Sequence, residues 1–229
     1  MKINGLQKLT LLDYPGHTAC TIFTAGCNFR CPFCHNAGLV TKIDDSDTIP
    51  PEEIISFLKK RAGLLDGVCI TGGEPLLQND IEEFMVEIKT LGYKVKLDTN
   101  GSRPEKLKPL IDKGLVDYIA MDIKNSRERY SETAGAEISI EDIEKSIHII
   151  KTCGVDYEFR TTVVKGLHET EDISSLAEWI SPCKRYFLQN FVDSGNLIGA
   201  GFSAHSPEAL EEMKRCATAF VPNAQIRGA

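Results

Sequence analysis

Short β-rich runs alternate with amphipathic helical segments along most of this 229-residue chain. The runs predict six strands, at residues 19–24, 67–71, 94–98, 118–122, 158–163 and 185–190. Apolar residues at helical spacing predict helices at residues 52–61, 81–91, 104–113, 140–153, 173–180 and 207–219. Strands that alternate with helices pair in parallel through right-handed crossovers. We therefore expect an α/β fold, a partial (βα)6 TIM-like barrel of parallel strands with helices outside.

The length and charge of the chain limit what it can be. A chain of this length fits one α/β domain, and we expect a single domain over residues 1–229. A formal net charge of −7 argues against nucleic acid as a partner. No apolar run is long enough to span a membrane and the first residues lack a signal-peptide pattern, so we expect a cytoplasmic protein. Polar or Gly- and Ser-rich stretches predict loops at 42–48 and 193–205.

Local signals mark the ends of several predicted helices. Ser206 followed by Pro207 is typical of an N-cap with proline at the first helical position. Ser139 with Asp142 resembles a capping box in which Asp replaces the usual Glu. Gly92 follows a predicted helix, as C-terminal glycines do. These signals agree with the helix positions that the apolar spacing predicts.

The eight cysteines are unevenly distributed. Three of them, Cys27, Cys31 and Cys34, fall within eight residues, directly after the first predicted strand. The other five are scattered, at Cys20, Cys69, Cys153, Cys183 and Cys216. In a reducing cytosol a disulfide framework is not expected, so the pattern indicates one metal site and five individual thiols. We interpret the scattered five as small buried hydrophobic residues, with a role as additional ligands or redox groups as the alternative.

The cysteine triplet lies at the C-terminal end of a predicted strand, where barrels place their functional loops. Three thiolates can hold three corners of a [4Fe–4S] cluster, which leaves one iron open to bind and activate a substrate. The alternative is a structural zinc site, which needs four ligands. His35, His17 or Cys20 could supply the fourth, but no second cysteine pair is present.

A family resemblance narrows these alternatives. The C-x3-C-x2-C spacing, with Phe33 before the last cysteine and Asn36 shortly after it, resembles the signature of the radical S-adenosylmethionine superfamily. The next predicted strand ends in Gly72-Gly73-Glu74-Pro75. Two glycines allow a close approach of the backbone to a ligand, and Glu74 offers a carboxylate, although the segment could also be a simple turn. In that superfamily the matching element contacts the methionyl amine of the cofactor.

Charged residues end the later predicted strands. Asp98 is followed by Thr99 and Asn100, and Asp122 is followed two residues later by Lys124. Two buried carboxylates on adjacent strands repel each other unless a cation or a lysine offsets the cost, whereas solvated loop carboxylates do not. The pattern resembles glycyl-radical activating enzymes of the pyruvate formate-lyase type. The resemblance implies that Asp98 and Asp122 hold a monovalent cation near the cofactor carboxylate and that Lys124 lines the site.

The last two predicted strands add two candidates. On the fifth predicted strand, the resemblance implies that the polar residue Arg160 faces the site. An arginine on a strand is otherwise more often partly exposed with a buried stem. On the sixth strand Gln189 takes a cofactor-binding position, although the sequence there departs from the Pro-Tyr-His of the pyruvate formate-lyase type.

Segments outside these motifs indicate a subgroup. Residues 5–8, 13–16 and 187–191 are similar to anaerobic ribonucleoside-triphosphate reductase activating proteins. This resemblance implies a [4Fe–4S] cluster, S-adenosylmethionine and a low-potential electron donor of the flavodoxin or ferredoxin type. It implies reductive cleavage of S-adenosylmethionine to a 5′-deoxyadenosyl radical, which abstracts hydrogen from a glycine of the partner reductase under anaerobic conditions.

Three alternatives stay open from the sequence. One is a radical S-adenosylmethionine enzyme that acts on a small molecule and needs no protein partner. Another is activation of a different glycyl-radical enzyme, such as pyruvate formate-lyase. The non-enzymatic alternative is a zinc-stabilised binding module, which metal analysis of the protein distinguishes from the other two.

Overall fold

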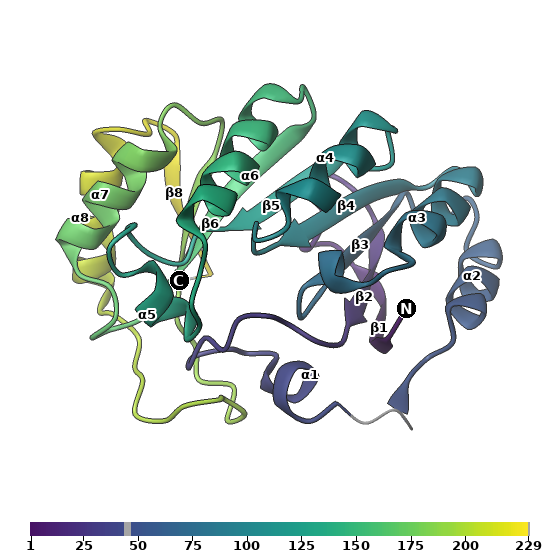
Figure 1. Cartoon of the computed structure of the whole chain (residues 1–229), viewed down its shortest axis with the longest axis horizontal. Helices are drawn as coiled ribbons and strands as arrows, with labels where there is room; N and C mark the ends of the chain where they lie inside the picture. Colours follow the sequence, from purple (N-terminus) through teal and green to yellow (C-terminus); the bar gives the residue numbers. More distant parts are fainter. Residues whose placement is uncertain (44–46, 229) are drawn as a thin grey trace.

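The computed structural model describes residues 1–43 and 47–228, so part of the expected loop at 42–48 lies outside the described residues. Within them the strands form one eight-stranded sheet, ordered β1 to β8 (Figure 1). β1 pairs antiparallel with β2, and each later pair of neighbours is parallel. The strands are β1 (Ile3–Thr10), β2 (Ala19–Thr24), β3 (Gly67–Gly72), β4 (Lys94–Thr99), β5 (Tyr118–Asp122), β6 (Asp156–Val163), β7 (Tyr186–Asn190) and β8 (Ala224–Arg227). The expected α/β partial barrel is confirmed.

The six predicted strands correspond to β2 through β7, with ends that differ by no more than two residues. β1 and β8 were not predicted, and both lie at an edge of the sheet. β8 has only four residues, and the middle of β1 is half-buried or exposed. Neither strand therefore carries the apolar pattern that marks a buried strand.

The six predicted helices are also present, and Figure 1 shows them along the outer side of the curved sheet. They are α2 (Pro51–Lys59), α3 (Ile81–Thr90), α4 (Pro104–Asp112), α6 (Ile140–Thr152), α7 (Thr170–Ile180) and α8 (Pro207–Thr218). The side chains of Ser139 and Ser206 accept hydrogen bonds from backbone amides of α6 and α8, as N-caps do. Two five-residue helices, α1 (Ala37–Thr41) and α5 (Tyr130–Ala134), were not predicted. No helix in the described residues is both long and apolar enough to cross a membrane.

The two faces of the sheet differ in chemistry. Successive residues of a strand point to opposite faces. In β4, Val95 and Leu97 are fully buried in the apolar layer between sheet and helices, whereas Lys96 and Asp98 point to the inner face. In β6, Phe159 belongs to the apolar layer and its neighbours on the inner face are charged. The sheet thus has an apolar outer face and a polar inner face.

Candidate active site

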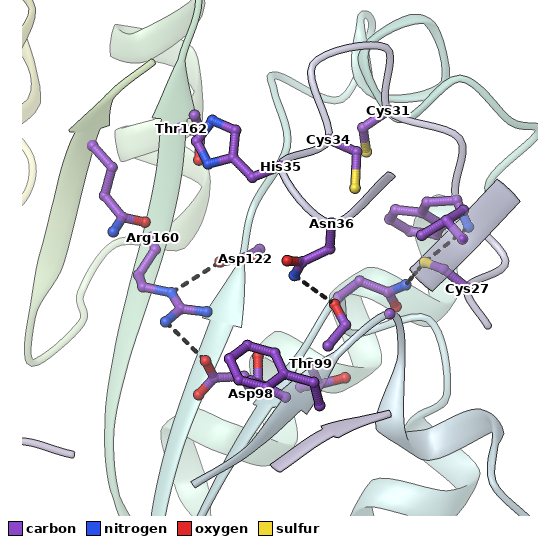
Figure 2. Close-up of a pocket in the computed structure, with 18 of the residues that line it drawn as sticks. Cys27, Cys31, Cys34, His35, Asn36, Asp98, Thr99, Asp122, Arg160 and Thr162 are labelled. Carbon is purple, nitrogen blue, oxygen red and sulfur yellow. Dashed lines mark hydrogen bonds and ion pairs between the residues drawn. The ribbon is translucent and has the colours of Figure 1, made fainter. Parts of the chain in front are cut away.

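The loop between β2 and α1 carries the cysteine triplet at the C-terminal end of β2. Cys27, Cys31 and Cys34 all line one cavity of about 420 Å³ on the inner face, and Figure 2 shows their sulfur atoms around it. All three thiols are free; Cys31 is buried and the other two are half-buried. The cavity volume falls in the range of small-molecule and cofactor sites.

The helix α5 helps to hold the cysteine loop in place. The amide of Arg30 donates to the Ala134 carbonyl at the end of α5, at 2.8 Å. Gly135, which follows α5 with a φ of +63°, packs so closely that a Cβ there would lie 2.2 Å from the Arg30 carbonyl oxygen. On the other side, the amide of Gly26 donates to the Leu39 carbonyl of α1 at 2.8 Å. Both unpredicted short helices therefore support the loop.

The environment of the thiols favours metal binding over free thiolates. Burial raises the pKa of Cys27 to about 11 and also raises the pKa of Cys31, so both are protonated without a metal. The backbone amide of Phe29 donates to the Cys27 sulfur at 3.3 Å, and the Asn100 side-chain amide lies 3.8 Å from it. These donors stabilise negative charge on a sulfur that binds iron.

The zinc alternative does not fit this geometry. In the parts of the chain that the structure describes, no three His, Cys, Asp or Glu side chains are gathered as ligands of one metal ion. Cys20 is fully buried in the apolar core. His17 lies away from the triplet, where its ring contacts Tyr14. His35 lines the cavity but packs against the ring of Phe191. The separated thiols suit a cluster, whose irons each take one cysteine.

The glycine pair serves the cysteine loop as well as the cavity. Gly72 and Gly73 line the cavity. A Cβ on Gly73 would lie 2.0 Å from the Gly26 carbonyl oxygen, and one on Gly72, where φ is +115°, would lie 2.4 Å from the backbone of Thr24. The amide of Glu74 donates to the same Gly26 carbonyl at 2.8 Å. The glycines are therefore required for the contact between the turn after β3 and the cysteine loop.

The Glu74 carboxylate, which we expected to offer a contact to the cofactor, faces the protein interior, and its contact with a ligand stays a prediction. Glu74 is fully buried, and neither it nor Pro75 lines the cavity. Its oxygens accept hydrogen bonds from the Leu76 amide (3.0 Å), the Thr99 hydroxyl (2.9 Å) and the Asn100 amide (2.7 Å). Burial raises the pKa of Glu74 to about 7, against the opposing effect of these three donors. Glu74 thus connects the turn after β3 to the end of β4, and Pro75 begins a short 3-10 helix (Pro75–Leu77).

Four further predicted residues line the cavity: Phe33, Asn36, Thr99 and Asn100. The Asn36 side-chain amide donates to the Gly72 carbonyl at 3.0 Å, which joins the cysteine loop to the glycine turn. Asn100 donates to the side-chain oxygen of Asn28 at 3.0 Å. The ring of Phe33 lies edge-on to the ring of His168, with the centroids 6.3 Å apart. Their contacts with a cofactor stay predictions.

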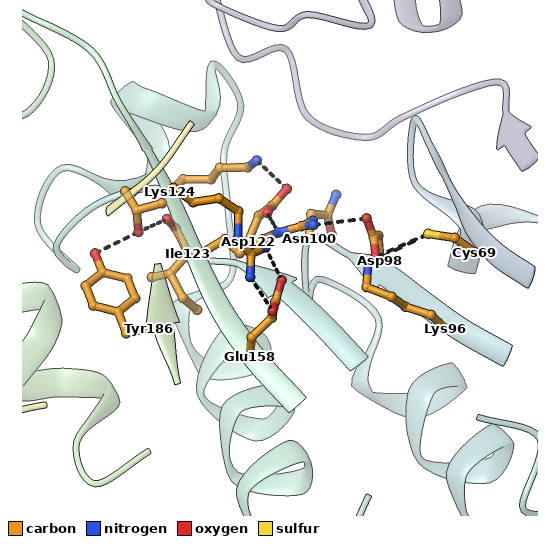
Figure 3. A network of polar contacts seen from close by, with 12 residues as sticks. Cys69, Lys96, Asp98, Asn100, Asp122, Ile123, Lys124, Glu158 and Tyr186 are labelled. Carbon is orange, nitrogen blue, oxygen red and sulfur yellow. Dashed lines mark hydrogen bonds and ion pairs between the residues drawn. The ribbon is translucent and has the colours of Figure 1, made fainter. Parts of the chain in front are cut away.

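Arg160 joins the two predicted acidic residues. Its Nε donates to Asp122 at 2.9 Å and its Nη1 donates to Asp98 at 3.1 Å (Figure 2). Lys96 forms an ion pair with Asp98, and Lys124 forms one with Asp122 at 3.2 Å (Figure 3). Protein cations therefore already contact both carboxylates that we expected to hold a monovalent cation. The cavity is also lined by five residues that the sequence analysis named as site candidates: Asp98, Asp122, Lys124, Arg160 and Gln189.

Sequence reasoning missed several residues that line the cavity, among them Gln7, Asp13, Thr21 and Thr162. Cys69 is buried, as the sequence predicted, but the sequence did not show which face of the sheet it occupies. It lies on the inner face, 3.8 Å from Asp98 and 3.7 Å from Lys96. Lys96 could have been found, because the alternation within β4 places it on the same face as Asp98. Cys153, Cys183 and Cys216 are half-buried and do not line the cavity.

Comparisons with known proteins agree with this geometry. The family model described as the Radical SAM superfamily matches residues 21–180. A Methanocaldococcus jannaschii protein named "Putative glycyl-radical enzyme activating enzyme MJ1227" is 34% identical over 235 residues, which cover 98% of this chain and 95% of that protein. A GTP 3′,8-cyclase of Helicobacter pylori is 32% identical over 67% of this chain but only 49% of the cyclase.

One solved structure shows the same fold. Streptococcus suis SuiB, in a crystal structure with its precursor peptide SuiA, superposes with a TM-score of 0.73 at 16% identity. The match covers 91% of this chain and 48% of SuiB. The chain therefore spans about half the length of this structure and of the cyclase, and nearly all of the archaeal protein.

Proposed function

Starting from the membership of this chain in the Radical SAM superfamily, we propose that it activates a glycyl-radical enzyme, specifically an anaerobic ribonucleoside-triphosphate reductase. The chain is a radical S-adenosylmethionine oxidoreductase whose cofactors are a [4Fe–4S] cluster and S-adenosylmethionine. The target enzyme, a flavodoxin- or ferredoxin-type electron donor and a cytoplasmic location are parts of the proposal.

When bound, the reduced cluster and S-adenosylmethionine would supply a 5′-deoxyadenosyl radical, with methionine as the other product of the broken S–C5′ bond, and this radical would take a hydrogen atom from the partner's glycine. In our proposal the chain's residues position these groups. Cys27, Cys31 and Cys34 hold three irons. The turn at Gly72 and Gly73 offers backbone groups to the methionyl end of the cofactor, since both residues line the cavity beside the cysteine loop.

One observation supports activation over small-molecule chemistry. The similarity to the archaeal protein named as an activating enzyme extends over 98% of this chain and 95% of that protein. The similarity to the GTP cyclase reaches only about half of the cyclase, so half of that enzyme has no counterpart in the aligned region. A cyclase-like reaction on a small molecule is therefore the second candidate, supported by the shared portion alone.

An exposed apolar patch next to the cavity favours a macromolecular substrate. Leu9, Leu11 and Leu12 are 57%, 70% and 88% exposed. They lie at the end of the edge strand β1 and in the loop after it, between Gln7 and Asp13, which both line the cavity. An exposed cluster of large apolar side chains is typical of a protein-binding surface. In our proposal the reductase contacts these leucines while its glycine segment enters the cavity.

The test is anaerobic reconstitution of the protein with iron and sulfide, followed by reductant, S-adenosylmethionine and the anaerobic reductase of the same organism. We expect the electron paramagnetic resonance doublet of a glycyl radical on the reductase and formation of 5′-deoxyadenosine. Reactions without reductase, and with a reductase whose radical-site glycine is replaced by alanine, are the controls. Cleavage of S-adenosylmethionine without any doublet would refute the proposed target and leave the small-molecule candidate.

A further inference from the structure

Two acidic side chains on the inner face of the barrel, at the cofactor cavity, have all their carboxylate oxygens paired with protein cations. Asp98 and Asp122 present four carboxylate oxygens, and each oxygen has its own nitrogen partner. Lys96 Nζ contacts Oδ1 of Asp98 and Arg160 Nη1 contacts its Oδ2. Arg160 Nε contacts Oδ1 of Asp122, and Lys124 Nζ contacts its Oδ2. Each oxygen of this pair is therefore already in contact with a protein cation.

The net charge of these ion-paired side chains also disfavours an additional cation. Two carboxylates face three protein cations, Lys96, Arg160 and Lys124, which leaves one positive charge in excess. Burial alone would raise the carboxylate pKa values. The neighbouring cations outweigh it, so the pKa of Asp98 is lowered and that of Asp122 falls to about 2. The two carboxylates are therefore ionised at neutral pH, and the three cations around them favour an anionic ligand, such as the carboxylate of a methionyl group.

Lys96 is the least expected member of this set. It is 1% exposed, and burying an ammonium group is costly unless the group is paired. Burial opposes its charge, but Asp98 and the nearby Cys69 more than compensate, so its pKa is raised. Because successive side chains of β4 point to opposite faces of the sheet, Lys96 lies on the inner face directly below Asp98 (Figure 3). Lys96 does not line the cavity, so it acts on a ligand only through Asp98 and Arg160.

We propose that the Lys96 ammonium group takes the place of the bound monovalent cation that the resemblance implied, so that cofactor binding by this enzyme is independent of sodium and potassium. Lys96 is a positioning residue. It holds one oxygen of Asp98, which leaves the other oxygen to orient the Arg160 guanidinium between Asp98 and Asp122. The excess positive charge then faces the cofactor side of the cavity without a dissociable ion.

This inference concerns only the cofactor, so it does not depend on which molecule receives the radical. The test measures the dissociation constant of S-adenosylmethionine on the reconstituted protein, without any partner. It compares potassium chloride, sodium chloride and choline chloride at one matched ionic strength, because choline is too large to replace a dehydrated metal cation and screening is kept equal. For the wild-type protein we expect dissociation constants that agree within about twofold in the three salts.

Two variants distinguish a charge role from a packing role. Lys96→Ala removes the charge and leaves space below Asp98, whereas Lys96→Met removes the charge but fills the space. We expect both to weaken cofactor binding by about tenfold or more in choline chloride, because one oxygen of a buried carboxylate loses its partner. Sodium or potassium should restore much of the affinity of Lys96→Ala and little of that of Lys96→Met. Lys94→Ala, an exposed lysine two residues earlier in β4, is the matched control and should bind as wild type.

Several results would overturn the proposal. Wild-type binding that weakens severalfold in choline chloride would show that the protein needs a metal cation, and this arm requires no variant. Unchanged binding by Lys96→Met in choline chloride would show that the ammonium charge is not used. Equal loss in Lys96→Ala and Lys96→Met with no rescue by sodium or potassium would show that a metal cation cannot take the place of the ammonium group below Asp98. The melting temperature of the Lys96→Ala protein without its iron–sulfur cluster provides a second readout, and we expect sodium or potassium, but not choline, to raise it.

Discussion

The two faces of the sheet are buried to a similar extent but are stabilised in different ways. On the outer face Val95, Leu97 and Phe159 pack against helices, and their stability comes from apolar area removed from water. On the inner face of the same strands, Lys96, Asp98 and Arg160 are held by ion pairs. An apolar contact that is lost costs its own area and a cavity, whereas a lost ion pair leaves a buried charge without a partner. The inner face is therefore intolerant of single changes even where it contributes little to net stability.

The largest functional effect should come from the cysteine loop. We expect Cys31→Ala to lose the cluster and all detectable cleavage of S-adenosylmethionine, because a cluster with two of three protein ligands is labile. Iron content and 5′-deoxyadenosine formation measure the loss. Cys153→Ala, at a cysteine that does not line the cavity, is the control and should retain both. An active, iron-loaded Cys31→Ala protein would contradict our assignment of the cluster ligands.

The largest effect on stability should come from Arg160. Arg160→Met leaves the half-buried carboxylates of Asp98 and Asp122 without their shared partner, with one lysine each, and should cost about 4 kcal/mol in the free energy of unfolding. In the wild type, the low pKa of Asp122 means that its ion pairs stabilise the fold above the ordinary aspartate pKa and are lost as the pH falls toward about 2. In the variant the carboxylates bind protons more readily. The loss of unfolding free energy in the variant relative to the wild type should therefore shrink as the pH is lowered. Denaturant unfolding at several pH values measures this loss. A loss that does not change with pH would indicate that packing, and not charge, was removed.

A change on the outer face should cost somewhat less and should not depend on pH. Leu97→Ala removes a fully buried side chain from the apolar layer and should cost about 3 kcal/mol. Denaturant unfolding of the protein without its iron–sulfur cluster, at several pH values, measures this cost. If the Leu97→Ala deficit changed with pH as the Arg160→Met deficit does, the two faces would not differ in the way we describe.

A smaller effect on stability is expected at Glu74, in the turn after β3. Glu74→Gln keeps one acceptor oxygen but presents an amide group to the donors that now contact the other carboxylate oxygen, and it should cost about 2 kcal/mol. We also expect weaker S-adenosylmethionine binding, because Glu74 holds the turn that carries Gly72 and Gly73. Calorimetric binding measures the second effect. Glu83→Gln, at an exposed position of α3, is the control.

The smallest effect on stability is expected for the exposed leucines. The double variant Leu11→Ser with Leu12→Ser should change the free energy of unfolding by less than about 1 kcal/mol, because both side chains are mostly in water. Cleavage of S-adenosylmethionine without reductase should be unchanged. The KM for the reductase should rise severalfold if the patch contacts it, and an unchanged KM would exclude the patch from the partner interface.

Much of the fold follows from local patterns. β2 through β7 and the six outer helices were predicted because each has an apolar face over several residues. α1 and α5 have only five residues each, too short for helical spacing to show. α7 begins three residues earlier than predicted, because a capping box between Glu169 and Asp172 extends it toward its N-terminus.

The sequence alone determined the order of strands and helices, the cysteine spacing and the family with its two cofactors, because all of these depend on neighbouring residues. Only the tertiary structure decided which charges pair. Asp122 and Arg160 are 38 positions apart and become neighbours through the register of β5 with β6. In the same way, the pairing of β3 with β4 brings Glu74 against the Thr99 hydroxyl and the Asn100 amide, away from the cavity. Pair energies depend on distance and burial, which strand register sets and no local pattern encodes.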